Sequence, residues 1–329
     1  MKHTGGVGIV GVGAYLPEKI LTNQDLEKMV DTTDEWIVTR TGIRERRIAP
    51  FEDASSDLGA RAAEEALRDA KMGPEEIELL ICATITPDML FPSTACFIQK
   101  KIKAKNAVCF DVSAACSGFI YAMNIAEQFL RNDIYKNALI IGAEKLSAIT
   151  DWKDRSTCVL FGDGAGACIL KKVKEGGILS TFLGSDGEQT DLLKIPAGGS
   201  RMPASLSTVR ERLHFLKMEG QELFKHAVRL MAEAAEKALS QVGLTCKDVT
   251  YLIPHQANIR IIQAVAKKIG LSPDKIYLNI EKYGNMSSAS TAVALYETIK
   301  FKKVKKGDIL VLVAFGSGLT WGATVIEWA

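Results

Sequence analysis

The sequence contains no apolar run that approaches the roughly 20 residues needed to cross a membrane as a helix. Its first residues, Met1–Gly6, lack the basic and apolar segments of a secretory signal peptide. It also lacks the CxxC spacing typical of zinc sites and redox dithiols, and its seven cysteines are an odd number. We therefore expect a cytoplasmic protein in a reducing compartment, with no disulfides and no metal site.

An excess of charge of one sign is also missing. The 41 Lys and Arg residues are offset by 39 Asp and Glu residues, which leaves a formal net charge of +2. This balance argues against a nucleic-acid-binding protein, whose footprint is a concentrated basic surface. With 329 residues, of which 47% are hydrophobic, the chain is long enough for two domains or one large α/β unit.

Short apolar runs rich in β-branched residues alternate with segments in which apolar residues recur three and four positions apart. The runs predict strands and the segments predict amphipathic helices, so we expect an α/β protein with mixed sheets. The clearest helix is predicted over Leu223–Leu239. Strands are predicted at Val7–Val12, Leu79–Ala83, Ala107–Val112, Ala138–Gly142, Thr157–Phe161, Ala167–Leu170, Thr250–Ile253, Ile276–Leu278, Ile309–Ala314 and Gly322–Trp328.

The two halves of the chain repeat one order of elements. In the first half, a predicted strand leads through a turn at Cys116 into a helix over Phe119–Leu130. In the second half, a predicted strand leads through a turn at Asn285 into a helix over Ala289–Ile299. We interpret this as an internal duplication, with one domain at residues 1–174 and another at 175–329. No low-complexity linker separates them, so we expect a packed interface.

Cys116 is the sharpest candidate for a functional residue. Small residues surround it at a predicted strand-to-helix turn, which leaves room for a bound group near the sulfur. The N-terminus of the following helix favours a thiolate, so we expect a pKa below the ordinary 8.5 or so. Its N–H groups also suit an oxyanion. The alternative is a buried structural cysteine, the commonest role of a free Cys.

His255 and Asn285 are weaker candidates when taken singly. His255 ends a predicted strand, where it could bind a substrate or cap the next helix. Asn285 lies in a Gly-Asn turn, where Asn is common for backbone reasons alone. The matching positions of Cys116 and Asn285 in the two halves, with His255 between them, favour a shared site.

Two glycine patterns are misleading. Gly6–Gly11 fits GxGxxG, but it falls within a predicted strand and no helix follows, as a dinucleotide site requires. Gly162–Gly166 lacks the Lys-Ser/Thr of a P-loop, and we interpret it as a tight turn between strands.

The chain resembles the 3-oxoacyl-[acyl-carrier-protein] synthase III family almost from end to end. The resemblance rests on Gly13–Pro17, Thr33–Ile37, Arg40–Ile43, Asp111–Gly118, Phe161–Gly166, Pro254–Asn258, Tyr283–Asn285 and Phe315–Gly322. It implies a thiolase-like fold with duplicated halves in five αβαβα layers, and a homodimer.

The resemblance also implies a reaction, the decarboxylative condensation that initiates type II fatty acid synthesis. Cys116 would take the primer, most simply acetyl, from acyl-CoA. His255 and Asn285 would hold the malonyl thioester of acyl carrier protein and stabilise the enolate formed as CO2 leaves. The products would be 3-oxoacyl-acyl-carrier-protein, CO2 and CoA. No cofactor is implied, because acyl-CoA is a substrate.

Further residues match the family's motifs. The oxyanion hole would be the backbone N–H groups of Cys116 and Ser317. Many members of the family carry Gly at the position of Ser317. Phe91 would close the acyl pocket from the neighbouring subunit. The residues matching the CoA tunnel are Thr32, Trp36, Arg40, Arg155, Gly220 and Asn258, with Trp36 and Arg155 sandwiching adenine. Those matching the basic surface for acyl carrier protein are Lys225, Arg260, Lys267 and Lys268, which could otherwise be ordinary solvated charges.

Other functions fit the sequence less well. Elongating synthases carry a second His where Asn285 stands, and thiolases carry a second catalytic Cys near the C-terminus, where none follows Cys246. A hydroxymethylglutaryl-CoA synthase would need an additional Glu as base, for which we find no motif. A CoA-binding scaffold with a dead site would lack one of the three candidate residues. A nucleotide-dependent oxidoreductase rests only on the glycine pattern.

Overall fold

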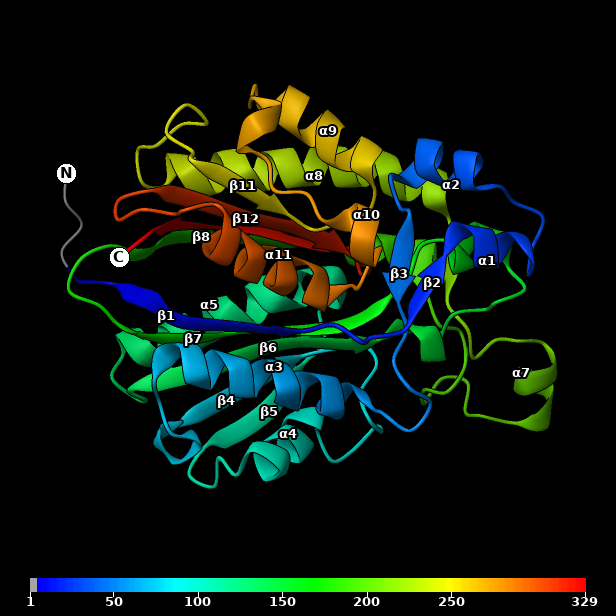
Figure 1. The fold of residues 1–329 in the computed structure, drawn as a ribbon, viewed down its shortest axis with the longest axis horizontal. Coiled ribbons are helices and arrows are strands. Elements are labelled where there is room, and N and C mark those ends of the chain that lie inside the picture. Colours follow the sequence, from blue (N-terminus) through cyan, green and yellow to red (C-terminus); the bar gives the residue numbers. More distant parts are fainter. Residues whose placement is uncertain (1–4) are drawn as a thin grey trace.

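The computed structural model describes residues 5–329 and stacks two sheets between three layers of helices (Figure 1). The outer layers are α8 (Gly220–Ser240) with α9 (Ile259–Lys268), and α3 (Ser55–Ala70) with α4 (Thr94–Ile102). The middle layer is α5 (Gly118–Arg131) with α11 (Ser288–Phe301). This confirms the predicted thiolase-like αβαβα arrangement. None of the helices within residues 5–329 is long and apolar enough to span a membrane.

The first sheet has five strands in the order β1-β7-β6-β4-β5. They are β1 (Val7–Tyr15), β7 (Asp163–Lys172), β6 (Asn137–Lys145), β4 (Leu79–Ala83) and β5 (Val108–Val112). Strand β4 runs parallel to β5 and β6, whereas β7 runs antiparallel to β6 and β1. The sheet is therefore mixed. Strands β4, β6 and β7 are almost wholly buried because helices cover both faces, whereas the edge strand β5 is only partly buried.

The second sheet, of four strands, repeats the order of the first four strands of the first sheet as β8-β13-β12-β11 and has no counterpart of β5. Its strands are β8 (Gly177–Ser185), β13 (Thr320–Glu327), β12 (Ile309–Gly316) and β11 (Tyr251–Pro254). Strand β11 is parallel to β12, and β13 is antiparallel to both of its neighbours, as at the matching places in the first sheet. The repeated order supports an internal duplication. The division at residues 174 and 175, between β7 and β8, stays a prediction.

Three local predictions are wrong. Residues 157–161 do not form a strand, because Asp154 accepts a hydrogen bond from the Ser156 N–H and starts the short helix α6 (Arg155–Cys158). Ile276–Leu278 is reduced to one parallel bridge, between Ile276 and Leu252. The glycine-rich segment Gly162–Gly166 is no turn, since β7 begins at Asp163.

Glycines in the first sheet let α11 approach closely. A Cβ on Gly142 would lie 2.8 Å from the carbonyl oxygen of Ser288, and one on Gly166 would lie 2.6 Å from the Cβ of Ala292. Side chains there would push the helix away. The start of α11, which follows Asn285, is therefore held against β6 and β7, in the same sheet as β5, which leads to Cys116.

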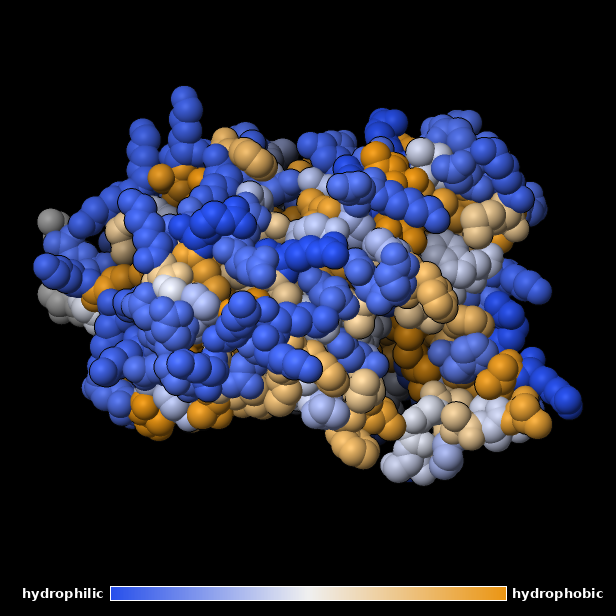
Figure 2. All heavy atoms as spheres, turned by 60° about the horizontal axis from the view of Figure 1, so that its bottom comes forward, coloured by the Kyte–Doolittle hydropathy of each residue, from blue (hydrophilic) through white to orange (hydrophobic). Residues whose placement is uncertain are grey.

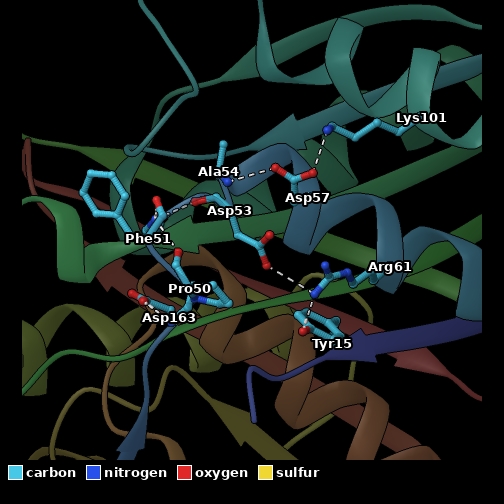
Figure 3. Close-up of polar contacts among 11 residues, drawn as sticks. Tyr15, Pro50, Phe51, Asp53, Ala54, Asp57, Arg61, Lys101 and Asp163 are labelled. Carbon is cyan, nitrogen blue, oxygen red and sulfur yellow. Dashed lines mark hydrogen bonds and ion pairs between the residues drawn. The ribbon is translucent and has the colours of Figure 1, made fainter. Parts of the chain in front are cut away.

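The loop before α3 is tied to the neighbouring elements (Figure 3). Asp57 accepts from the Ala54 N–H at 2.9 Å and from Lys101 at 2.6 Å, and Asp53 pairs with Arg61 at 3.2 Å. From the end of β6, the ammonium group of Lys145 donates to backbone carbonyls of residues 50 and 51 at 2.8 and 2.9 Å. These contacts fix the end of β6, where Glu144 lies.

The remaining short elements gather at the end of the molecule opposite the chain termini (Figure 1). They are β2 (Ile20–Thr22), α1 (Asn23–Glu27), α2 (Asp34–Thr41), β3 (Glu45–Arg47), β9 (Leu193–Lys194), α7 (Leu206–Arg210), β10 (Lys217–Met218) and α10 (Ile280–Tyr283). Helix α2 packs against α9. Strands β9 and β10 pair as a two-stranded ribbon, from which the segment carrying α7 projects.

Candidate active site

Cys116, His255 and Asn285 line one cavity of about 310 Å³. They come from three separate places, the turn before α5, the end of β11 and the turn before α11. A second cavity of about 350 Å³ also reaches Cys116 and Asn285. Its wall includes the apolar residues Ile85, Leu146, Ile149, Phe161, Leu193, Ile195, Leu216 and Met218. The structure thus brings the three candidate catalytic residues together where two cavities meet.

Cys116 lies in a short 3-10 turn, Ala115–Ser117, directly before α5, and is 8% exposed. The end of β12 lies against it. A Cβ on Gly316, the last residue of β12, would come within 2.6 Å of the Cys116 backbone nitrogen, so only glycine allows this approach. Ser317 and Gly318, which follow in the turn after β12, line the second cavity. The predicted partners in the oxyanion hole, Cys116 and Ser317, therefore belong to segments in contact.

The expectation of a low pKa for Cys116 is wrong. Burial raises the pKa of this thiol to about 12, because a thiolate loses its hydration there. The Ser287 hydroxyl acts in the opposite direction, and the buried Glu144 carboxyl adds to the rise. With its pKa raised in this way, the resting sulfur is a thiol at neutral pH.

Glu144 is a buried group that no motif in the sequence identified. Its carboxyl accepts from the Thr86 hydroxyl at 2.7 Å and from the Ile85 N–H at 3.1 Å. The Ser288 hydroxyl donates to its other oxygen at 2.9 Å. Burial raises the pKa of Glu144, and these donors oppose the rise. The carboxyl joins the end of β6 to the turn that carries Asn285.

His255 follows β11 and is held by its backbone N–H, which donates to the Val313 carbonyl at 2.7 Å. Only 2% of the residue is exposed. Burial lowers its pKa to about 3, so the imidazole is neutral at pH 7. Its Nδ1 has no hydrogen-bond partner among residues 5–329. A neutral imidazole offers one donor and one acceptor to a ligand.

Asn285 is fixed through both backbone and side chain. Its N–H donates to the Leu160 carbonyl at 2.9 Å, and its carbonyl accepts from the Gly162 N–H at 3.0 Å. Its side-chain oxygen accepts from the Ser287 N–H at 2.8 Å. The carboxamide is therefore held in one orientation at the cavity wall.

Four of the six predicted CoA residues line the 310 Å³ cavity, namely Trp36, Arg40, Gly220 and Asn258. Thr32 and Arg155 are not among the residues that line it. The Arg155 guanidinium lies 4.6 Å from the centre of the Trp36 ring. This stacking leaves no space for adenine between the two side chains, so a sandwich requires Arg155 to swing away.

The other predicted contacts lie on the surface. Phe91 is 83% exposed and is not among the described residues that line either cavity of this single chain. Lys225 on α8 and Arg260, Lys267 and Lys268 on α9 are all exposed. Lys225 pairs with Glu222 at 2.7 Å.

The fold and the cavity at Cys116 together define a condensing enzyme of the thiolase-like class. More particularly, the chain belongs to the 3-oxoacyl-[acyl-carrier-protein] synthase III family. Residues 110–187 match the model "3-Oxoacyl-[acyl-carrier-protein (ACP)] synthase III", and residues 239–328 match the model of its C-terminal part. The chain is thus an acyltransferase.

Relatives match over nearly the whole length. A beta-ketoacyl-[acyl-carrier-protein] synthase III from Caldanaerobacter subterraneus is 57% identical, and so is one from Clostridioides difficile, each over 98% of both chains. The crystal structure of the synthase III from Aquifex aeolicus is 49% identical, with a TM-score of 0.91 over 98% of this chain and 100% of that one.

Proposed function

We propose that this enzyme transfers an acyl group from acyl-CoA to Cys116 and condenses it with malonyl-acyl-carrier-protein. This is the priming step of type II fatty acid synthesis. One observation carries the proposal. The only three side chains needed for the chemistry, those of Cys116, His255 and Asn285, line one cavity. The reaction needs no cofactor and no metal, since acyl-CoA is consumed as a substrate.

In the first half-reaction, the Cys116 sulfur attacks the thioester carbon of acyl-CoA. The bond to the CoA sulfur breaks, and CoA leaves as a thiol with the proton that Cys116 gives up. The negative oxygen formed on the way is bound by the backbone N–H groups of Cys116 and Ser317, whose segments are in contact through Gly316. Fixed donors of this kind stabilise a developing oxyanion.

In the second half-reaction, His255 and Asn285 donate hydrogen bonds to the malonyl thioester oxygen. CO2 leaves, and the electrons of the broken C–C bond form an enolate at that oxygen. The enolate carbon attacks the acyl carbon on Cys116, and the sulfur is released and regains a proton. A neutral His255, as its low pKa requires, serves as a donor without placing a full charge in the buried cavity.

The two cavities give the substrates separate places. We assign the 310 Å³ cavity, with Trp36, Arg40, Gly220 and Asn258 on its wall, to the pantetheine arms of CoA and carrier protein. Thr32 and Arg155 would contact the adenosine end outside it. The 350 Å³ cavity, with its apolar wall, takes the acyl chain. We propose acetyl as the primer, following the family.

We propose a homodimer in which Phe91 of each subunit closes the acyl pocket of the other. Phe91 and the neighbouring Leu90 are both 83% exposed, which is unusual for large apolar residues. Figure 2 shows hydrophobic residues along the lower edge of the molecule and around a hollow at its lower right. A second subunit would cover such a surface.

We also propose that acyl carrier protein, which is acidic, docks on α8 and α9. Lys225, Arg260, Lys267 and Lys268 are exposed on these helices. The same helices supply the cavity wall through Phe224 and Ile261, so a carrier bound there would stand beside the channel. Complementary charge speeds such an encounter.

Intact-mass measurement after incubation with acetyl-CoA tests the proposal. We expect one acetyl adduct on the wild-type protein and none on Cys116→Ala. Addition of malonyl-acyl-carrier-protein should remove the adduct and give 3-oxoacyl-carrier-protein. A mass unchanged by every acyl-CoA tried would instead favour a binding scaffold without catalysis.

A further inference from the structure

The β9–β10 ribbon separates the two cavities at Cys116. Four residues line both cavities, which are Cys116 and Asn285 together with Leu193 and Met218. Leu193 and Met218 are paired partners in the ribbon. The same two side chains therefore form the wall of the acyl pocket on one side and of the CoA channel on the other.

The ribbon is short and depends on outside contacts. Each strand has only two residues, and a two-stranded pair of this kind is marginal by itself. The Glu219 N–H holds its edge by donating to the Leu192 carbonyl at 2.8 Å. The hydroxyl of Ser317 adds a side-chain contact, a hydrogen bond to the Leu193 carbonyl.

Ser317 belongs to the segment Phe315–Gly318, which comprises the end of β12 and the turn after it and which we call the oxyanion loop. The preceding residue, Gly316, lies against the Cys116 backbone nitrogen. The oxyanion loop thus makes two contacts. Its backbone at Gly316 lies against the nucleophile Cys116, and its Ser317 hydroxyl is bonded to the β9–β10 ribbon, which separates the two cavities. A shift of the ribbon would be transmitted to the position of the Ser317 N–H.

We propose that Ser317 is a positioning residue whose hydroxyl fastens the oxyanion loop to the β9–β10 ribbon, and so keeps the enzyme active on primers too short to press on that ribbon. An acetyl methyl fills only a small part of a 350 Å³ cavity. A butyryl chain reaches further and contacts the apolar wall, which holds the ribbon in place by packing. The inference rests on the proposed function, because it assigns this cavity to the primer.

The test compares acetyl-CoA with butyryl-CoA as primers in steady-state condensation. In Ser317→Ala we expect kcat with acetyl-CoA to fall about two- to tenfold, the range that one such hydrogen bond supplies. With butyryl-CoA we expect a distinctly smaller fall, and an unchanged KM for malonyl-acyl-carrier-protein. Ser317→Thr, which keeps a hydroxyl, should restore the wild-type ratio of the two primers.

Ser180→Ala is the matched control. The Ser180 hydroxyl on β8 also donates to a backbone carbonyl, that of Ala238 at 2.6 Å, but away from both cavities. It should leave the primer ratio as in wild type. The inference would be overturned if kcat in Ser317→Ala fell equally with both primers, or fell with neither. The proposed function would still stand in that case, as long as the wild-type protein catalysed condensation. A wild-type protein that acylates with neither primer would overturn both.

Discussion

The backbone N–H of Ser287 donates a hydrogen bond of 2.8 Å to the side-chain oxygen of Asn285. Because an N–H requires an acceptor, this contact fixes which end of the carboxamide is oxygen. The NH2 end remains for the cavity. Ser287 has a φ of 47°, which is uncommon for a residue other than glycine. Strain of this kind occurs at functional sites, and here it accompanies the contact that orients the Asn285 side chain, which we propose to bind a thioester oxygen.

The rate at which iodoacetamide alkylates Cys116 should rise about tenfold for each pH unit from about pH 6 to about pH 9, without a plateau. With a pKa raised to about 12 by burial, the thiolate fraction keeps increasing over this whole range. Peptide mass spectrometry separates Cys116 from the other six cysteines. A rate that levels off, with a midpoint at or below about pH 8.5, would show that the dipole of α5 lowers the pKa of Cys116 by more than burial raises it.

Acid should destabilise the protein partly through His255. The folded imidazole has a pKa of about 3, against 6.5 ordinarily, so below about pH 6.5 only the unfolded chain takes up this proton. The contribution of His255 to the free energy of unfolding is complete above about pH 6.5. It is lost as the pH falls below this value, at roughly 1.4 kcal/mol per pH unit.

Urea unfolding at pH 7 and at pH 5 measures this effect. Between these two conditions, His255→Gln should lose roughly 2 kcal/mol less free energy of unfolding than wild type, since it has no imidazole to protonate. Equal losses in the two proteins would mean that the folded histidine accepts a proton near its ordinary pKa.

Arg155→Ala and Trp36→Ala should each raise the KM for acetyl-CoA by about two- to fivefold, the range of one exposed cation–π contact. The Arg155 guanidinium already lies 4.6 Å from the centre of the Trp36 ring, so adenine would partly replace a contact that the two side chains make with each other. The KM for malonyl-acyl-carrier-protein, which lacks adenine, should not change. A KM for acetyl-CoA that stays at the wild-type value in both variants would remove the pair from the CoA site.

Arg260→Glu should lower kcat/KM for malonyl-acyl-carrier-protein far more than the rate of Cys116 acylation from acetyl-CoA. The reversed charge repels an acidic carrier, and the effect should weaken as salt is added. Arg68→Glu is a matched control, because Arg68 is exposed on α3 in the opposite outer layer. Equal losses with both substrates, or an equal loss in the control, would contradict a carrier site on α9.

Regular elements were predictable from the sequence, whereas local exceptions were not. The strand Leu79–Ala83 has the predicted bounds, because a fully buried parallel strand reads as an uninterrupted apolar run. The false strand at 157–161 is apolar too, but Asp154 is a helix N-cap three residues upstream, a signal that the apolar run masked. Gly162–Gly166 lies largely within β7, where Gly164 lies against Met286 and Gly166 against Ala292 of α11, and no local pattern contains such tertiary contacts.

The site was predictable in its residues and not in its electrostatics. The motifs around Cys116, His255 and Asn285 identified three side chains that the fold places on one cavity. The raised pKa of Cys116 results from burial and from Glu144, and Ser287 opposes it; Glu144 and Ser287 are both distant from Cys116 along the chain. The β9–β10 ribbon was missed because strands of two residues leave no periodic signal. Ser287 could have been found, since it shares the turn of Asn285.

The most direct test separates the two half-reactions in His255→Ala, Asn285→Ala and the near-isosteric Asn285→Asp, which replaces the donor by an acceptor. We expect all three variants still to form the acetyl adduct on Cys116, because its oxyanion donors are backbone groups. We expect CO2 release from malonyl-acyl-carrier-protein to fall by about 100-fold or more, as the loss of one such donor implies. Condensation near the wild-type rate in His255→Ala and Asn285→Ala would contradict the roles proposed for His255 and Asn285.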